Sequence, residues 1–173
     1  ILQAEQISKA YGEKQVLQDI SVTLNQGELV CLLGVSGVGK TTLFNILSGL
    51  ATPDSGRVLL DGKEITGETG HLSYMLQKDL LLPHKTVLDN VALTLRLAGK
   101  KKKEARQEAN AYFAQFVLVG KQKKYPVQLS GGMRQRAALL RTYMCGDQVA
   151  LLDEPFSALD TLTKTAMQEW YLK

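Results

Sequence analysis

The sequence predicts an α/β fold, and three observations predict it. A glycine-rich stretch at residues 34–42 follows an apolar run at residues 29–33 and precedes a helical pattern that starts at Leu43. Apolar and polar residues alternate through residues 1–24, as they do in edge strands. A second apolar run, at residues 149–152, ends in two acidic residues. We therefore expect a buried strand that leads into a glycine loop and a helix.

Length and composition predict one globular domain. The chain has 173 residues, of which 45% are hydrophobic and 22% are charged. The net charge of +4 is weak support for a nucleic-acid or anionic lipid partner, because the lysine run at residues 100–103 is better explained as a solvated helix start. No apolar run approaches the length of a membrane span, and the first residues do not form a secretory signal. Cys31 and Cys145 predict two separate packed thiols in a reducing compartment, with the cytoplasm as the default.

The first third of the chain predicts strands joined by turns. Gly12 stands in the turn between two alternating segments, and Asp61-Gly62 favours a tight type I′ turn inside a hairpin at residues 58–65. A further short strand is expected at residues 72–76. Tyr11 is an aromatic residue on a loop. It could stack on a purine base, or it could simply close a strand end.

The stretch GVSGVGKTT, residues 34–42, matches the pattern GxxxxGK[ST]. Glycines at these positions let successive backbone N–H groups converge on one anion, and the N-terminus of the next helix adds positive potential. Lys40 would reach the β and γ phosphates, and Thr41 would supply a hydroxyl ligand to Mg²⁺. A glycine-rich turn that matches by chance is the alternative. The predicted ligand is a nucleoside triphosphate.

The middle of the chain predicts helices. One is expected over about residues 86–97, after a loop whose residues Leu80 to Leu82 and Pro83 look exposed. Another is expected to place an apolar stripe against the neighbouring helices as core. The stripe comprises Ala105, Ala109, Tyr112, Phe113 and Phe116.

Two further stretches predict contacts with a ligand. Ser130, Gly131 and Gly132 open a helix, so they form either a second backbone anion site or a simple N-cap. Asp153 and Glu154 follow a buried strand, where carboxylates need a partner or a ligand. Asp153 would hold Mg²⁺ through its water shell, and Glu154 would polarise a water for attack on the γ phosphate. A helix cap at residues 156–161 is the alternative explanation for this acidic pair.

These stretches occur in one order along the chain. Tyr11, GVSGVGKT, Gln77, LSGGM, LLDE and the turn at residues 157–160 together resemble the nucleotide-binding domain of ABC transporters. The resemblance implies a P-loop NTPase (RecA-like) core with an antiparallel β-subdomain and an inserted α-helical subdomain. Residues 1–77 and 148–173 would form the ATP-binding core with its β-subdomain, and residues 78–147 would form the helical subdomain.

The resemblance also implies roles for single residues. Tyr11 is similar to the adenine-stacking aromatic, and Gln77 to the glutamine that contacts Mg²⁺ and the attacking water. Ser130 to Gly132 would contact the γ phosphate of ATP held by an opposite subunit. Thr41, Gln77 and Asp153 are the implied Mg²⁺ ligands, and Glu154 and Gln77 the catalytic pair. The implied phosphate-binding residues are Gly34, Ser36, Gly37, Gly39, Lys40, Thr41 and Thr42.

The sequence departs from the family pattern in two places. Met133 stands where many members have glutamine, and no histidine follows the turn at residues 157–160, where the family has its switch histidine. His71 and His84 lie too early in the chain for that role. The chain begins at Ile1 and stops inside a helical pattern that includes Leu162 and Trp170, so we expect a chain truncated at its C-terminus.

The segment from Gln77 to Leu93 and the stretches LSGGMRQRAALLR and DEPFSALD resemble bacterial importers of nitrate, sulfonate, taurine and thiamine precursors. This implies an ATPase that powers solute import from the cytoplasmic face of the membrane. The implied partners are a second such subunit in a head-to-tail homodimer, transmembrane permease subunits and, indirectly, a solute-binding protein, with no nucleic acid. Two alternatives are an ABC protein of DNA repair or translation and a module that binds ATP without hydrolysing it.

Overall fold

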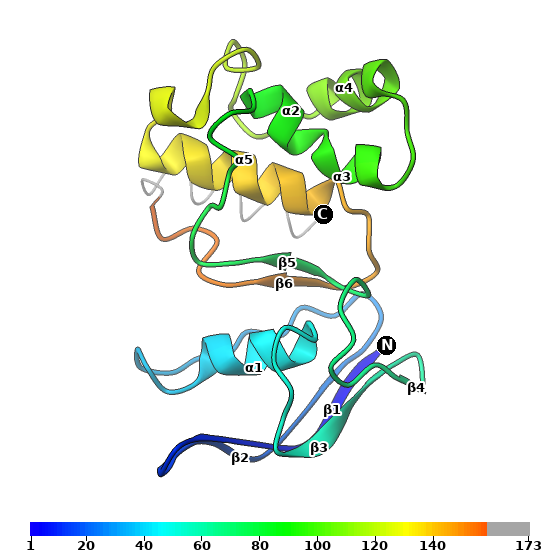
Figure 1. Cartoon of the computed structure of the whole chain (residues 1–173), viewed down its shortest axis with the longest axis vertical. Coiled ribbons are helices and arrows are strands. Elements are labelled where there is room, and N and C mark those ends of the chain that lie inside the picture. The colour runs from blue at the N-terminus through cyan, green and yellow to red at the C-terminus, as the bar shows by residue number, and fades with distance from the viewer. Residues whose placement is uncertain (159–173) are drawn as a thin grey trace. The chain divides into compact units, whose positions relative to one another are not determined.

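The computed structural model describes residues 1–158, which form two compact units (Figure 1). The first unit comprises residues 1–73 and 147–151. The second comprises residues 74–146 together with the segment that starts at Leu152. The domain boundaries expected from the sequence, after residues 77 and 147, stay a prediction.

The first unit contains a four-stranded antiparallel sheet in the order β2-β1-β3-β4. Its strands are β1 (Leu2–Tyr11), β2 (Lys14–Leu24), β3 (Ser55–Leu60) and β4 (Lys63–Glu64). Leu2 and Ala4 alternate with exposed or half-buried neighbours, and Val58 of β3 is fully buried. The alternation at residues 1–24 therefore predicted strands correctly, but only β2 is the expected edge strand, because β1 pairs with β2 on one side and with β3 on the other.

The turn between β3 and β4 follows from its two residues. Asp61 and Gly62 have φ angles of 50° and 78°, both in the left-handed region that a type I′ turn requires. Leu60 pairs with Lys63 across this turn. The hairpin predicted at residues 58–65 is confirmed.

Helix α1 (Lys40–Leu47) follows the glycine-rich loop in the same unit. Leu43, Ile46 and Leu47 are buried, as the helical spacing predicted. The apolar pattern of this helix continues to Leu50 in the sequence, but the helix ends before that residue. Ser48 forms the C-cap, and Leu50 lies beyond it with 58% of its surface exposed.

The apolar run at residues 29–33 does not form the predicted buried strand. Leu29 is 58% exposed and Leu33 is 92% exposed. A strand needs a neighbour for its backbone hydrogen bonds and a layer over its side chains, and the sheets of residues 1–158 include no strand that pairs with this run. The predicted strand is therefore wrong for this structure.

The predicted packing of the two cysteines is also wrong. Cys31 lies in the exposed run, and Cys145 is exposed beyond the end of helix α5 (Gly131–Tyr143). Met144, one residue earlier, takes the buried position at that helix end.

The second unit packs helices around one hydrophobic core (Figure 1). Its helices are α2 (Val87–Val91), α3 (Leu93–Leu97), α4 (Lys102–Ala111), the short 3₁₀ helix η1 (Pro126–Gln128) and α5. The single helix predicted over residues 86–97 is thus two short helices that meet at Ala92. None of the helices within residues 1–158 has the length and apolar character that a bilayer crossing requires.

The predicted apolar stripe does line this core. Ala105 and Ala109 of α4 and the later residues Phe113 and Phe116 are at most 1% exposed. The chain leaves α4 after Ala111, so the two phenylalanines extend from turns rather than from the predicted helix. The core prediction is confirmed, and the predicted helix was too long.

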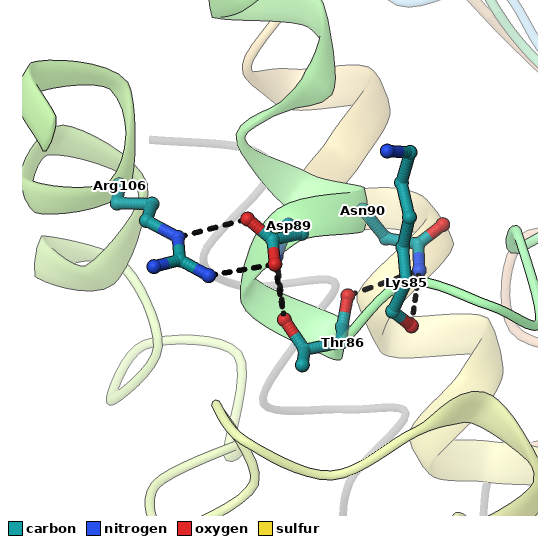
Figure 2. Close-up of polar contacts among 5 residues, drawn as sticks. All are labelled: Lys85, Thr86, Asp89, Asn90 and Arg106. Atoms are coloured by element: carbon teal, nitrogen blue, oxygen red, sulfur yellow. Dashed lines mark hydrogen bonds and ion pairs between the residues drawn. The ribbon is translucent and has the colours of Figure 1, made fainter. Parts of the chain in front are cut away.

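The loop before α2 is held by the buried side chain of Asn90. Its Oδ1 accepts from Leu82 N at 2.7 Å, and its Nδ2 donates to the Leu82 carbonyl at 3.1 Å. The same Nδ2 donates to the carbonyls of Lys85 and Thr86 at 3.2 and 3.0 Å (Figure 2). Leu81 is only 7% exposed and joins the helical core, and Leu82 is half-buried. The expectation that Leu80 to Leu82 and Pro83 are exposed therefore holds for Leu80 and Pro83 and fails for Leu81 and Leu82. A fully buried amide that satisfies four backbone groups fixes the loop strongly.

A second polar cluster caps the start of α2 and binds it to α4 (Figure 2). Thr86 caps the helix by accepting from Asp89 N at 3.1 Å, and its hydroxyl donates to Asp89 Oδ2 at 2.9 Å. Arg106 of α4 donates to both carboxylate oxygens of Asp89, at 2.8 and 2.7 Å. The guanidinium lowers the pKa of Asp89, and the fork geometry ties α4 to α2.

Two arginines of α5 hold the loop that follows Gln77. Arg141 donates to the carbonyls of Asp79 and Leu80 at 2.7 and 2.8 Å. Arg134 donates to the Asp79 carboxylate at 3.1 Å and to the carbonyl of Leu129 at 3.0 Å. The first residues of the loop are therefore bonded to the helix that starts after Ser130.

Strands β5 (Ser73–Met75) and β6 (Ala150–Leu152) form a two-stranded sheet. Both strands were predicted, each slightly longer than observed. The Asp153 amide donates to the Met75 carbonyl at 3.0 Å, which fixes the direction of the chain as it leaves β6. The acidic pair therefore follows directly from a hydrogen-bonded strand.

Candidate functional site

The glycine-rich loop of the first unit ends at a position where the backbone conformation and the close neighbours require glycine. Gly39 has a φ of 110° and forms the N-cap of α1. A Cβ here would lie 3.0 Å from both the Val16 carbonyl oxygen and Leu17 Cδ2. No side chain caps α1 and no acidic residue occupies its first turn. The helix start thus has the polarity that suits an anion, and its N-cap glycine has no side chain that would compete for this position.

The side chain of Lys40 folds back over this loop. Its Nζ donates to the carbonyls of Gly34 and Val35 at 2.6 and 3.0 Å. Ser36 and Gly37 form the exposed tip of the loop, and Thr41 and Thr42 lie in the first turn of α1. All the phosphate-binding residues predicted within residues 34–42 therefore lie in this loop or in the first turn of α1. The Lys40 ammonium group lies against the carbonyls of the same loop.

Tyr11 lies at the end of β1 in the same unit and is 53% exposed. Lys9 Nζ is 5.6 Å from the centre of its ring. Asp54 holds this strand end by accepting from Lys9 Nζ at 2.8 Å and from Ala10 N at 2.7 Å. The exposed ring is suited to stacking, and its role in base binding stays a prediction.

In the second unit, Gln77 and Glu154 are in direct contact. Gln77 Nε2 donates to Glu154 Oε2 at 3.1 Å, although the two residues are 77 positions apart. Both are exposed, so a water molecule and a phosphate can reach the carboxylate. The two residues predicted to be catalytic are thus brought together.

Asp153 and Glu154 differ sharply in burial. Asp153 is only 4% exposed, while Glu154 is an exposed residue. Burial and the nearby negative charge of Asp153 raise the pKa of Tyr74 to about 12, so this phenol stays neutral. Adjacent carboxylates in such different surroundings are suited to different roles.

Ser130 forms the N-cap of α5 and accepts from Met133 N at 3.3 Å. The simple-cap interpretation is therefore satisfied, but a hydroxyl that accepts one bond still has a proton to donate. A Cβ built on Gly131 would meet nothing within 4 Å, so the helix start faces open space. The expected second anion site remains compatible with this geometry.

Comparison with known proteins identifies the family. The family model described as "ABC transporter" matches residues 17–157 of this chain. The chain belongs to the ABC transporter family. It is 45% identical to the formylaminopyrimidine import ATP-binding protein ThiZ of Halalkalibacterium halodurans over 98% of this chain, and 42% identical to the taurine import ATP-binding protein TauB of Escherichia coli K12 over 100%. The chain spans about two thirds of these relatives, 66% of ThiZ and 68% of TauB.

Solved structures give the same ABC fold. The ATP-binding cassette MJ0796, in a dimeric post-hydrolysis state with ADP and Pi, superposes with a TM-score of 0.90 at 28% identity. The match covers 99% of this chain and 81% of that one. The expected P-loop NTPase fold of an ABC cassette and the expected family are confirmed, whereas the roles of single residues stay predictions.

The residues of this ABC cassette fit Mg²⁺ by the chemistry of their donors. The proposed ligands Thr41, Gln77 and Asp153 offer a hydroxyl, an amide oxygen and a carboxylate, which are the hard oxygen donors that Mg²⁺ prefers. Within residues 1–158, no group of three or more His, Cys, Asp and Glu side chains could hold a metal on its own. Three donors such as Thr41, Gln77 and Asp153 suit a cation that takes its other ligands from phosphate and water.

Sequence reasoning missed one residue of the ABC cassette that contacts the segment after β6. Gln135, in the middle of α5, is only 6% exposed and lies beside an open hollow of about 430 Å³ lined also by Gln77, Gly131 and Ser157. A polar residue four positions before the buried Leu139, on the apolar face of its helix, was the signal available. Predicted residues Leu159 and Asp160 lie outside the described part of the chain.

Proposed function

We propose that this chain is the ATP-binding subunit of an ABC importer and that it hydrolyses ATP to ADP and phosphate to power solute uptake. The observation that carries the hydrolytic part is the contact between Gln77 and Glu154 at 3.1 Å. A module that only binds ATP has no need of a carboxylate held by an amide at this point. The names of ThiZ and TauB, both import ATP-binding proteins, support the transport assignment.

The phosphates of ATP bind to the loop at residues 34–42. Amides at the start of α1 and the Lys40 ammonium neutralise their charge, and Ser36, Gly37 and Thr42 complete the cradle. Tyr11 stacks on the adenine. The helix start at Gly39 supports this assignment, because this N-cap residue makes no side-chain capping bond.

Glu154 polarises the attacking water, and the Gln77 amide orients that water and the carboxylate. Asp153, Thr41 and Gln77 would hold Mg²⁺, which would supply positive charge to offset that of the phosphates. The low exposure of Asp153 supports giving it a different role from that of the exposed Glu154. The two acids then divide the work, because Asp153 binds the cation and Glu154 acts on water.

The functional unit is a head-to-tail dimer in which Ser130, Gly131 and Gly132 contact the γ phosphate held by the other subunit. The dimeric form of the MJ0796 cassette supports this assembly. Further partners are transmembrane permease subunits and, indirectly, a solute-binding protein, so the chain acts at the cytoplasmic face of the membrane without nucleic acid. The solute belongs to the nitrate, sulfonate, taurine or thiamine-precursor group, in line with the compounds in the names of ThiZ and TauB.

The decisive experiment replaces Glu154 by Gln in the full-length protein reconstituted with its permease. We expect ATP binding to persist and turnover to fall by roughly 10² to 10⁴, because the amide cannot accept a proton from water. Binding is measured with a fluorescent ATP analogue and turnover by phosphate release. An unchanged rate would refute the role of Glu154. Co-purification of the protein with ribosomes or DNA in place of a permease would refute the transport assignment.

A further inference from the structure

Gln135 is a buried amide of α5 that reaches the segment after β6. Its Nε2 donates to the carbonyl of Glu154 at 2.9 Å and to Ser157 Oγ at 3.0 Å. Its Oε1 accepts from the backbone N–H of Ala158 at 2.9 Å. One side chain, only 6% exposed, therefore bonds three residues within a stretch of five.

The backbone of Glu154 is unusual and needs such support. Its φ is 51°, in the left-handed region that residues with a side chain rarely adopt. The Glu154 carbonyl accepts from Gln135 and also from Ser157 N at 3.2 Å. The carboxylate accepts from Gln77. Glu154 is thus held at its backbone by one glutamine and at its acidic group by another.

The partners of Gln135 link two parts of the candidate site. Gln135 is five residues after Ser130, so it lies just over one turn along the helix that the serine caps. Any tilt of this helix start therefore moves the amide that fixes Glu154. The same amide also fixes the turn at Ser157 and Ala158.

We propose that Gln135 is a positioning residue for Glu154, which it holds in the conformation that activates water. The inference rests on the proposed hydrolysis of ATP and deepens it. Gln135 itself touches neither phosphate nor water in this scheme. It acts through the backbone of residues 154–158, and it makes the catalytic carboxylate sensitive to the position of α5.

The test compares two substitutions in α5 of the full-length protein. Gln135→Met keeps the length of the side chain and removes its three hydrogen bonds. Thr142→Val is the matched control, because Thr142 is equally buried at 6% and its hydroxyl donates to the Ala138 carbonyl within the same helix. We expect Gln135→Met to lower kcat by roughly 10- to 100-fold with an unchanged KM for ATP, since small displacements of a catalytic group are costly. Thr142→Val leaves kcat unchanged.

A double variant shows whether the effect passes through Glu154. On the background of Glu154→Gln, adding Gln135→Met is expected to change the residual rate by less than about threefold, because the carboxylate that it positions is already gone. Full additivity of the two losses would overturn the inference, as would a Gln135→Met protein with the kcat of the wild type. A wild-type protein without any ATP turnover would instead overturn the proposed function, which the phosphate-release assay on that protein detects separately.

Discussion

In the proposed ATP site, Lys40 is the side chain that places a positive charge on the glycine-rich loop. Its ammonium rests on two carbonyls of the loop, and the helix start beside it has no acidic residue and no side-chain cap. Positive charge is therefore concentrated where the backbone amides converge. A bound phosphate would give this ammonium an anionic acceptor in place of two neutral carbonyl oxygens.

Replacement of Lys40 by Ala is expected to weaken ATP binding by roughly 10- to 100-fold, because one charge-assisted hydrogen bond to phosphate is lost. Titration with a fluorescent ATP analogue measures the affinity. Lys63→Ala is a suitable control, since Lys63 is an exposed lysine of β4 in the same unit. Equal affinities for the two variants would contradict the role of Lys40.

At the residue scale, local chemistry could be predicted and distant contacts could not. The pattern around Lys40 and the Asp61-Gly62 turn depend on neighbouring residues, so the sequence alone indicated both. The contact of Gln77 with Glu154 joins residues 77 positions apart, and only the resemblance to a family suggested it. Gln135 escaped notice because its partners lie about 20 positions further along the chain.

At the scale of elements, the ion pair that joins α2 to α4 depends on the Asp89 carboxylate. Arg106 holds the pKa of Asp89 below its usual value of 3.8, with a further contribution from Thr86. The pair therefore stabilises the folded protein above that pH, and the stabilisation is lost as the pH falls through the lowered pKa.

Asp89→Asn is expected to reduce the free energy of unfolding by about 1 kcal/mol at neutral pH, because the pair is partly exposed and solvent weakens it. The difference from the wild type should shrink once the pH falls below the usual value of 3.8. Urea unfolding at several pH values measures both quantities. Glu13→Gln, in the exposed turn between β1 and β2, provides the control. A difference that is the same at every pH would rule out the ion pair as its source.

Elements were predicted best where their stability is local. The β3 and β4 hairpin follows from its turn, and the start of α5 follows from the Ser130 cap. The run at residues 29–33 failed because an apolar strand is defined by its neighbours rather than by its own residues. The predicted helix over residues 86–97 failed at Ala92, where the side chain remains buried but the backbone turns.

At the scale of the whole molecule, the proposed dimer places the start of α5 against a nucleotide on another subunit. Gly131→Tyr tests this without disturbing the isolated chain, because a Cβ at Gly131 meets nothing within 4 Å. We expect the full-length protein with Gly131→Tyr to keep its melting temperature and ATP binding. The ATP-induced dimer of the Glu154→Gln protein should be lost when Gly131→Tyr is added. Light scattering after size-exclusion chromatography measures the dimer, and a persistent dimer would exclude this interface.

The arginines of α5 have a mechanical consequence. Arg134 and Arg141 fasten Asp79 and Leu80 to the helix by three hydrogen bonds spread along its length. These bonds couple the position of the segment after Gln77 to the position of α5. In the proposed importer, a permease subunit that displaced this segment would therefore also displace the helix that begins after Ser130.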